Sequence, residues 1–293
     1  MRSTLQSWLL AARPKTLTAS LGPVVVGTAL AWADKGEVLW WVVVLTLLSS
    51  LFIQVGTNLV NDVVDFKKGA DDEKRVGPQR VTQSGLIAPK TVFIMAAVCF
   101  LVAVLCGVPL VFRGGMPIFI VGLVSVLMGY GYTAGPFPLA YRGLGDVFVI
   151  LFFGLIAVGG VYFLHTLELS MNAIIAGFQV GFLATVLIAI NNLRDIDGDK
   201  KVHKRTLPVR FGKRFARIEI AGLALGPFVL GFYWYSLDFF WPFVLPWLVF
   251  PLAVLIVKMI FATEPGPAYN LYLAKSALLQ LMFCFLLAAG FFL

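Results

Sequence analysis

Charged residues are scarce in this sequence. Asp, Glu, Lys and Arg make up 13% of its 293 residues, about half of the ~25% that soluble domains carry. Hydrophobic residues make up 60%, and the mean hydropathy is +0.91. No soluble core accounts for so much apolar sequence, so the composition excludes an ordinary soluble enzyme and predicts an integral membrane protein.

Histidine and cysteine are also rare, with two and three residues in the whole chain. His165 and His203 stand alone, and Cys99, Cys106 and Cys284 lie within apolar runs. A zinc site needs several Cys or His ligands at close spacing, and these residues do not provide one. We interpret the cysteines as small core residues rather than as disulfides or metal ligands.

Long apolar runs, by contrast, dominate the chain. Crossing a hydrocarbon layer takes about 20 residues of helix, and nine segments approach that length. They are residues 17–32, 39–59, 92–112, 116–132, 147–164, 173–190, 218–237, 239–261 and 271–293. None shows the alternation of a barrel strand, and only a helix satisfies its own backbone hydrogen bonds in lipid. We therefore expect an all-α polytopic membrane protein with nine transmembrane helices.

The basic residues predict how these helices are oriented. Lys and Arg concentrate near the N-terminus and in the second–third and sixth–seventh connections, which nine spans place on one side. The positive-inside rule assigns that side to the cytoplasm. We expect a multi-pass protein of the cytoplasmic (inner) membrane, with its N-terminus in and its C-terminus out. Residues 1–293 are expected to form a single domain, a helical bundle around a central cavity that cytoplasmic loops 2–3 and 6–7 cap.

The two polar connections, residues 61–90 and 192–215, begin alike. Each starts with an Asn followed by two Asp, spaced i, i+4, i+7 in the first and i, i+4, i+8 in the second, so each set lies on one helical face. The residues are Asn58, Asp62 and Asp65, and Asn191, Asp195 and Asp199. Asp62 and Asp195 are 133 residues apart, which suggests a degenerate duplication with pseudo-repeat halves at about residues 1–140 and 141–293.

These acids and the cations beside them predict a site for a phosphorylated lipid. An acid near lipid needs a cavity, a cation or a basic partner, and carboxylate and amide oxygens suit Mg²⁺. Clustered Lys and Arg can clamp the diphosphate oxygens. The candidates are Lys74, Arg75, Arg80, Lys201, Lys204 and Arg205. A solvated cap and a topological signal would explain either loop alone, but repetition of both features favours a metal and diphosphate site.

At this point the sequence resembles the UbiA superfamily of intramembrane aromatic prenyltransferases. The resemblance covers nearly the whole chain, which opens with "RPKTL". The stretches "NLVNDVVDFKKGADD", "RVGPQRVTQSGLI", "YTAGPFPLAYRGLGD" and "NNLRDIDGDKK" are similar to the 1,4-dihydroxy-2-naphthoate polyprenyltransferases of menaquinone synthesis. The superfamily's first motif often has an acid four residues after the first; this chain has Phe66 there and offers Asp65 instead.

The resemblance implies a reaction and roles for individual residues. A polyprenyl diphosphate would bind two Mg²⁺ through Asp62, Asp195 and Asp199 and ionise to an allylic cation, with Asp62 and Asp195 essential to catalysis. A carbon of the naphthoate would then attack, with loss of carbon dioxide, to give a demethylmenaquinol. Tyr130 and Tyr132 are candidates to stabilise the cation, or belong to an interfacial aromatic belt.

The acceptor is itself an anion, so a further cation is expected near it. Arg13, Lys15 and Arg142 are the candidates, with a purely topological charge as the other interpretation of Arg13. The expected partners are polyprenyl diphosphate, the naphthoate and the lipid bilayer, with no nucleic acid.

Two other functions stay open. One is a sister prenyltransferase that uses hydroxybenzoate or homogentisate, and the other is a membrane transporter, although transporter sites lie near the midplane rather than at one face. The signature of CDP-alcohol phosphatidyltransferases is absent.

Overall fold

The computed structural model describes residues 4–69, 77–135 and 138–293, apart from the side chain of Lys15, and these residues form helices and loops without a strand. The first half contains α1 (Thr4–Ala12), α2 (Pro14–Lys35), α3 (Trp40–Lys67), α4 (Pro89–Gly131), η1 (Leu139–Tyr141), α5 (Gly145–Val149), η2 (Ile150–Ile156) and α6 (Ala157–Thr166). The second half contains α7 (Met171–Arg194), α8 (Ile196–Lys201), α9 (Leu207–Leu230), α10 (Phe232–Ser236), α11 (Phe240–Val244), η3 (Leu245–Val249), α12 (Phe250–Ala262) and α13 (Tyr269–Phe292).

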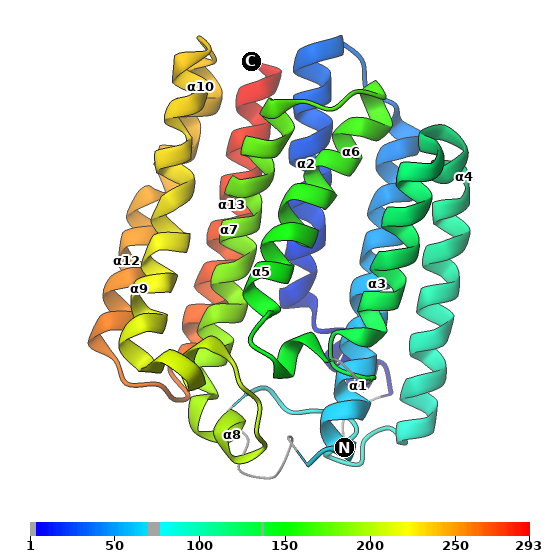
Figure 1. The fold of residues 1–293 in the computed structure, drawn as a ribbon, viewed down its shortest axis with the longest axis vertical. Coiled ribbons are helices and arrows are strands. Elements are labelled where there is room, and N and C mark those ends of the chain that lie inside the picture. Colours follow the sequence, from blue (N-terminus) through cyan, green and yellow to red (C-terminus); the bar gives the residue numbers. More distant parts are fainter. Residues whose placement is uncertain (1–3, 70–76, 136–137) are drawn as a thin grey trace.

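Eight helices in the described residues are long and apolar enough to cross a membrane. One of them, α4, is two helices joined at Gly115, whose φ of 65° and ψ of −151° are not helical. A methyl group built on Gly129 would lie 2.8 Å from the Phe100 ring, because the chain folds back after Gly115 (Figure 1). With the two halves of α4 counted separately there are nine crossing helices, and the expected all-α polytopic fold is confirmed.

Some spans are built from several short elements. α5, η2 and α6 together form the span Gly145–Thr166, and α11, η3 and α12 lie within the span Phe240–Ala262. The seventh span starts earlier than expected, at Leu207, but Gly212 (φ 84°, ψ 172°) separates its first turn from the rest. Sequence hydropathy found the apolar centre of this span and missed its short amphipathic beginning.

The helices form one bundle, and different connecting segments lie at its two ends (Figure 1). α1, α8 and the N-terminal end lie at one end, and α10 and the C-terminal end lie at the other, as an odd number of crossings requires. The largest buried apolar cluster joins α2, α7, α9, α12 and α13, and includes Leu30, Leu183, Phe228, Ile256 and Phe283. α3 and both halves of α4 stand beside this cluster, which leaves room for a cavity between them and α5–α7.

Candidate active site

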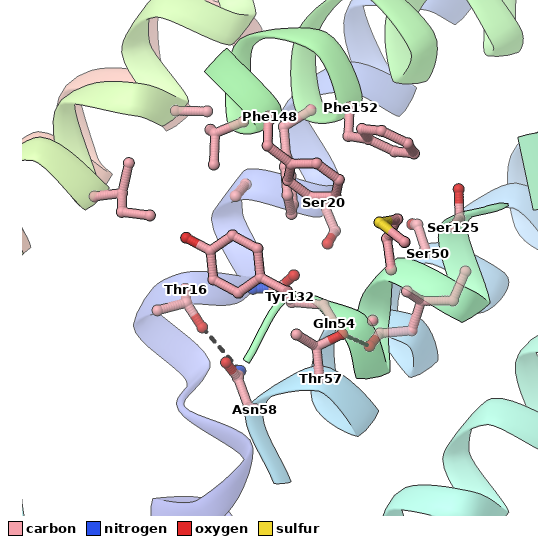
Figure 2. A pocket seen from close by; sticks show the side chains of 18 of the residues that line it. Thr16, Ser20, Ser50, Gln54, Thr57, Asn58, Ser125, Tyr132, Phe148 and Phe152 are labelled. Atoms are coloured by element: carbon pink, nitrogen blue, oxygen red, sulfur yellow. Dashed lines mark hydrogen bonds between the residues drawn. The ribbon is translucent and has the colours of Figure 1, made fainter. Parts of the chain in front are cut away.

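A cavity of about 710 Å³ lies among α2, α3, α4, α5–α6 and α7. Its walls include apolar residues of the spans, such as Phe148, Phe152 and Ile188. At the end where α8 lies, residues of the two polar connections line it, among them Arg80 and Lys204. Figure 2 shows its middle, where Tyr132 lies between Asn58 and Phe148. The cavity is thus apolar over most of its wall and charged at one end.

The end of α3 presents Asp65 to this cavity. One carboxylate oxygen, Oδ1, accepts a hydrogen bond from the Tyr141 hydroxyl at 3.1 Å, and Oδ2 lies 3.5 Å from Nη2 of the buried Arg80. Burial raises the pKa of Tyr141 well above its ordinary value, and the charge of Asp65 raises it further. Tyr141 therefore stays protonated and donates to Asp65.

Asn61 and Asp62 differ in where they point, although they are neighbours. Asn61 lines the cavity, and its Oδ1 accepts a hydrogen bond from the Thr133 hydroxyl. Asp62 is 1% exposed and is not among the lining residues; its two oxygens accept hydrogen bonds from the backbone N–H groups of Val81 (3.3 Å) and Thr82 (3.0 Å). Asp62 therefore holds the loop that carries Arg80, and Asn61 and Asp65 are the polar pair that faces the cavity.

Asn58 lies one turn deeper than Asn61 and also lines the cavity. Its Nδ2 donates to the Ala12 carbonyl at 3.0 Å and to Oγ1 of Thr16 at 3.1 Å, and Arg13 donates to its carbonyl at 3.3 Å. Asn58 therefore ties α3 to the junction of α1 and α2.

The end of α7 is organised by a buried arginine. Arg194 donates to both carboxylate oxygens of Asp195, at 2.8 and 2.7 Å, and to Oδ1 of Asn191 at 2.6 Å. A fourth bond, 2.7 Å long, reaches Oδ1 of Asn270 at the start of α13. The bidentate contact fixes the plane of the Asp195 carboxylate. Asn191 and Arg194 line the cavity, and sequence reasoning assigned no role to Arg194.

Asp199, on α8, is the last of the predicted acids, and neither it nor Asp195 is among the residues that line the cavity. Asp199 is buried, with Lys204 Nζ 3.3 Å from one oxygen and the Thr206 hydroxyl 3.4 Å from the other. Burial raises the pKa of Asp199, Lys204 opposes that rise, and the charges of Asp195 and Asp65 add to it. Tyr141 connects the two acidic segments, because its hydroxyl donates to Asp65 at 3.1 Å and its ring centroid lies 5.8 Å from Nζ of Lys204, the partner of Asp199.

The cations expected to bind diphosphate separate into three groups. Arg80 and Lys204 line the cavity. Lys201 and Arg205 are exposed and are not among the lining residues. Lys74 and Arg75 lie outside the described residues. Lys68, which sequence reasoning passed over, lies 4.1 Å above the Tyr141 ring and donates to the Thr133 carbonyl at 2.8 Å.

The remaining candidates also differ in location. Arg13 and Tyr132 line the cavity, and the Tyr132 ring is 5.5 Å from that of Phe148. Tyr130 is 46% exposed and Arg142 is exposed, and neither lines the cavity. The side chain of Lys15 lies outside the described part of the chain.

The residues at the charged end fit Mg²⁺ as a mixed oxygen donor set. No three acidic, His or Cys side chains among the described residues cluster closely enough to hold a metal by themselves. The amide oxygens of Asn61 and Asn191 and the carboxylates of Asp65, Asp195 and Asp199 are hard donors, and Mg²⁺ usually completes its shell with water and substrate phosphates.

Comparison with known proteins agrees with this geometry. Residues 20–279 match the UbiA prenyltransferase family. The chain is 37% identical to a 1,4-dihydroxy-2-naphthoate octaprenyltransferase of Escherichia coli K12, over 87% of this chain and 84% of that protein. It is 38% identical to the enzyme of the same name in Haemophilus influenzae, over 73% and 72%.

Solved structures share the fold at low sequence identity. A UbiA homolog from Archaeoglobus fulgidus bound to DMAPP and Mg²⁺ superposes with a TM-score of 0.66 at 17% identity, covering 96% of this chain and 99% of that one. The apo structure of a UbiA homolog from Aeropyrum pernix K1 gives 0.70 at 15%, covering 95% and 97%. This chain is a member of the UbiA prenyltransferase family.

Proposed function

We propose that this protein transfers a polyprenyl group from a polyprenyl diphosphate to 1,4-dihydroxy-2-naphthoate, releasing carbon dioxide and diphosphate and forming a demethylmenaquinol. The names of its bacterial relatives support the naphthoate acceptor. The observation that carries the proposal is a set of polar residues at one end of an apolar cavity. Asp65, Arg80, Arg194 and Lys204 line it, with Arg80 3.5 Å from Asp65, Arg194 2.7 Å from Asp195 and Lys204 3.3 Å from Asp199. Such an end binds a metal–diphosphate group, and such a cavity holds an isoprenoid chain.

We propose that two Mg²⁺ ions bind at this end of the cavity. The residues that would hold them are Asn61, Asp65, Asn191, Asp195 and Asp199. When bound, the metal supplies positive charge that stabilises the departing diphosphate. This set of proposed metal ligands differs from the set predicted from the sequence. Asn61 is added because it faces the cavity. Asn58 instead ties α3 to the start of α2, and Asp62 holds the loop that carries Arg80.

Protein cations and aromatic rings bind the diphosphate and stabilise the allylic cation in this proposal. Arg80 and Lys204 bind diphosphate oxygens, and Lys68 lies close enough to assist. The faces of Tyr132 and Phe148 lie along the wall beyond the charged end, where they stabilise a developing allylic cation. The apolar wall keeps water from that cation, which water would otherwise quench. Arg13 also lines the cavity, and we propose that it binds the naphthoate carboxylate.

We propose that this multi-pass protein lies in the cytoplasmic membrane with the charged end of the cavity facing the cytoplasm. The positive-inside rule supports this orientation, because the basic loops and α8 lie at that end of the bundle. Both substrates then reach the site from the cytoplasmic leaflet or the cytosol.

The test uses purified protein in detergent or liposomes with a polyprenyl diphosphate, Mg²⁺ and the naphthoate. Prenylated product is expected with Mg²⁺ and not with a chelator, and Asp65→Ala and Asp195→Ala are expected to lower turnover by at least a hundredfold while insertion persists. A stronger preference for 4-hydroxybenzoate or homogentisate would replace the acceptor in this proposal. Transport of a solute by liposomes that form no product would refute the enzyme.

A further inference from the structure

The side of α3 that faces the cavity is polar along nearly its whole length. The α3 residues that line the cavity deeper than Asn58 recur every three or four residues, singly or as adjacent pairs, as one helical face requires. They are Thr46, Ser49, Ser50, Ile53, Gln54 and Thr57, of which only Ile53 is apolar. Figure 2 shows Ser50, Gln54 and Thr57 along one side of the cavity, with Ser125 of α4 close to them.

The wall formed by α5, η2 and α7 is of the opposite kind. Its lining residues include Phe148, Phe152, Ile156, Leu187 and Ile188, which offer no hydrogen bond. Figure 2 shows Phe148 and Phe152 on the other side of the cavity from Gln54 and Thr57. One cavity therefore presents a polar wall and an apolar wall at the depth of the membrane.

Three of the four hydroxyl groups of the polar wall have already used their protons, and the fourth, that of Thr46, has no hydrogen-bond partner among the described residues. Thr57 donates to the Ile53 carbonyl at 2.8 Å, Ser50 donates to a backbone carbonyl at 3.0 Å, and Ser49 does the same at 3.0 Å. Their oxygen lone pairs remain available as acceptors. Gln54 differs, since its amide makes no hydrogen bond within the described residues, although it can donate two and accept two.

An amide without hydrogen bonds in a membrane cavity costs free energy, because it has lost its contacts with water. The polar wall therefore suits a ligand that can form hydrogen bonds with it. A prenyl chain offers none and gains more from the apolar wall. The ring hydroxyls of a hydroxyaromatic acceptor can donate to the lone pairs of Thr57 and Ser50 and can both donate to and accept from Gln54. The two walls thus match the two substrates.

The distance along α3 agrees with this division. Thr57 and Gln54 precede Asn61 by four and seven residues, which is about 6 and 10 Å of helix rise. A reacting ring carbon must come within about 3–3.5 Å of the first prenyl carbon, which is attached to the diphosphate at the charged end. The ring hydroxyls then fall a few ångströms deeper, at the level of Thr57 and Gln54.

We infer that the polar wall of α3, with Gln54 at its centre, is the subsite that orients the ring hydroxyls of a hydroxyaromatic acceptor, while the opposite wall takes the prenyl chain. This inference rests on the proposed function only in requiring an acceptor of that class. Gln54 is a specificity-determining residue in this arrangement and takes part in no proton transfer.

The experiment compares Gln54→Leu with the wild type and with Leu48→Ala, a control on the lipid-facing side of α3. Gln54→Leu is expected to lower kcat/KM for the naphthoate by about 10- to 100-fold, the range for losing a hydrogen bond to a buried partner. The KM for prenyl diphosphate should stay within twofold of the wild type, and Leu48→Ala should match the wild type in both. Thermal unfolding with prenyl diphosphate and Mg²⁺ checks the fold, and Gln54→Met replaces Gln54→Leu if the latter does not accumulate.

Two acceptor analogues, each lacking one ring hydroxyl, locate the contact through their inhibition constants against the naphthoate. The wild type and Gln54→Leu should have the same inhibition constant for the analogue that lacks the hydroxyl held by Gln54, as in a double-mutant cycle. Three results would each overturn the inference. They are an equal loss of affinity of Gln54→Leu for every analogue, an increase confined to its KM for prenyl diphosphate, and no loss of its kcat/KM for the naphthoate. If the wild type prefers another hydroxyaromatic, that acceptor and its deoxy analogues serve in the same way, so failure of the naphthoate assignment remains distinguishable from failure of the subsite.

Discussion

At the scale of single residues, Asp62 and Asp65 show how three positions along one helix change the role of a carboxylate. Asp65 faces the cavity, with Arg80 and Tyr141 beside it, whereas Asp62 is buried against the backbone of residues 81 and 82. The sequence pattern Asn-x3-Asp occurs twice in overlapping registers, and the register Asn61-x3-Asp65 is the one that lines the cavity. Both registers satisfy the same helical spacing, so spacing alone cannot choose between them.

Replacing Asp62 and Asp65 is therefore expected to have different consequences. Asp62→Ala leaves two buried N–H groups without an acceptor, at a cost of about 1–3 kcal/mol, and releases the loop that carries Arg80. We expect a lower unfolding temperature and a higher KM for prenyl diphosphate, measured in detergent. Asp65→Asn should keep the unfolding temperature and lose turnover and Mg²⁺ dependence. If Asp62→Ala unfolds like the wild type yet loses its Mg²⁺ response, Asp62 is a direct ligand after all.

Tyr141 gives a prediction about pH. Burial first, and then the charge of Asp65, raise the pKa of Tyr141, so the hydroxyl remains protonated at neutral and mildly alkaline pH. Tyr141→Phe should lower kcat by about tenfold through loss of the hydrogen bond to Asp65, and the shape of the pH profile from 7 to 9 should not change. An alkaline decline of the wild type that vanishes in Tyr141→Phe would show that the hydroxyl ionises in this range.

At the scale of elements, glycines determine which helices can approach closely enough to close the cavity. A Cβ built on Gly154 of η2 would clash with the Gly177 carbonyl oxygen and lie 2.7 Å from the Gly181 Cα. Such backbone approach through small residues is the usual way in which membrane helices pack. It brings α7, with Asn191 and Asp195 at its end, alongside the wall that carries Phe148 and Phe152.

Gly154→Ala should therefore separate η2 from α7 and destabilise the protein by about 1–3 kcal/mol, as overpacked cores do. The matched control is Gly159→Ala on α6, where an added Cβ meets nothing within 4 Å. Thermal unfolding followed by fluorescence-detected size exclusion measures the difference. Similar melting temperatures for the two variants would mean that this contact does not limit stability.

At the scale of the whole molecule, α8 and α10 lie at opposite ends of the bundle because α9, which connects them, crosses it once (Figure 1).

The proposed internal duplication is also a property of the whole chain, and it stays a prediction. Asn61 and Asp65 precede Asn191 and Asp195 by 130 residues each, and both pairs border the same cavity or pair with residues that do. We propose this register for the two halves in place of the spacing of 133 residues.

Cysteine labelling in intact cells tests the orientation. Asp197, in the α8 segment, and Asp238, after α10, are both exposed and lie at opposite ends. In a variant without the three native cysteines, Asp238→Cys should react with a membrane-impermeant maleimide in intact spheroplasts. Asp197→Cys should react only after lysis. The reverse pattern would invert the topology and place the active site outside.

The sequence by itself determined the membrane class, the nine apolar helices, the polar ends of the second and sixth spans and the resemblance to a family. These are properties of local composition and spacing, and hydrophobic burial in lipid acts on each segment nearly independently. The tertiary structure alone decided that Asn61 and Asp65 face the cavity, that Asp62 holds a loop, that Arg194 orients Asp195, and that α3 presents a polar wall. Those facts depend on how each helix is rotated about its axis and on which neighbour it meets, and that rotation results from packing between segments distant in the chain.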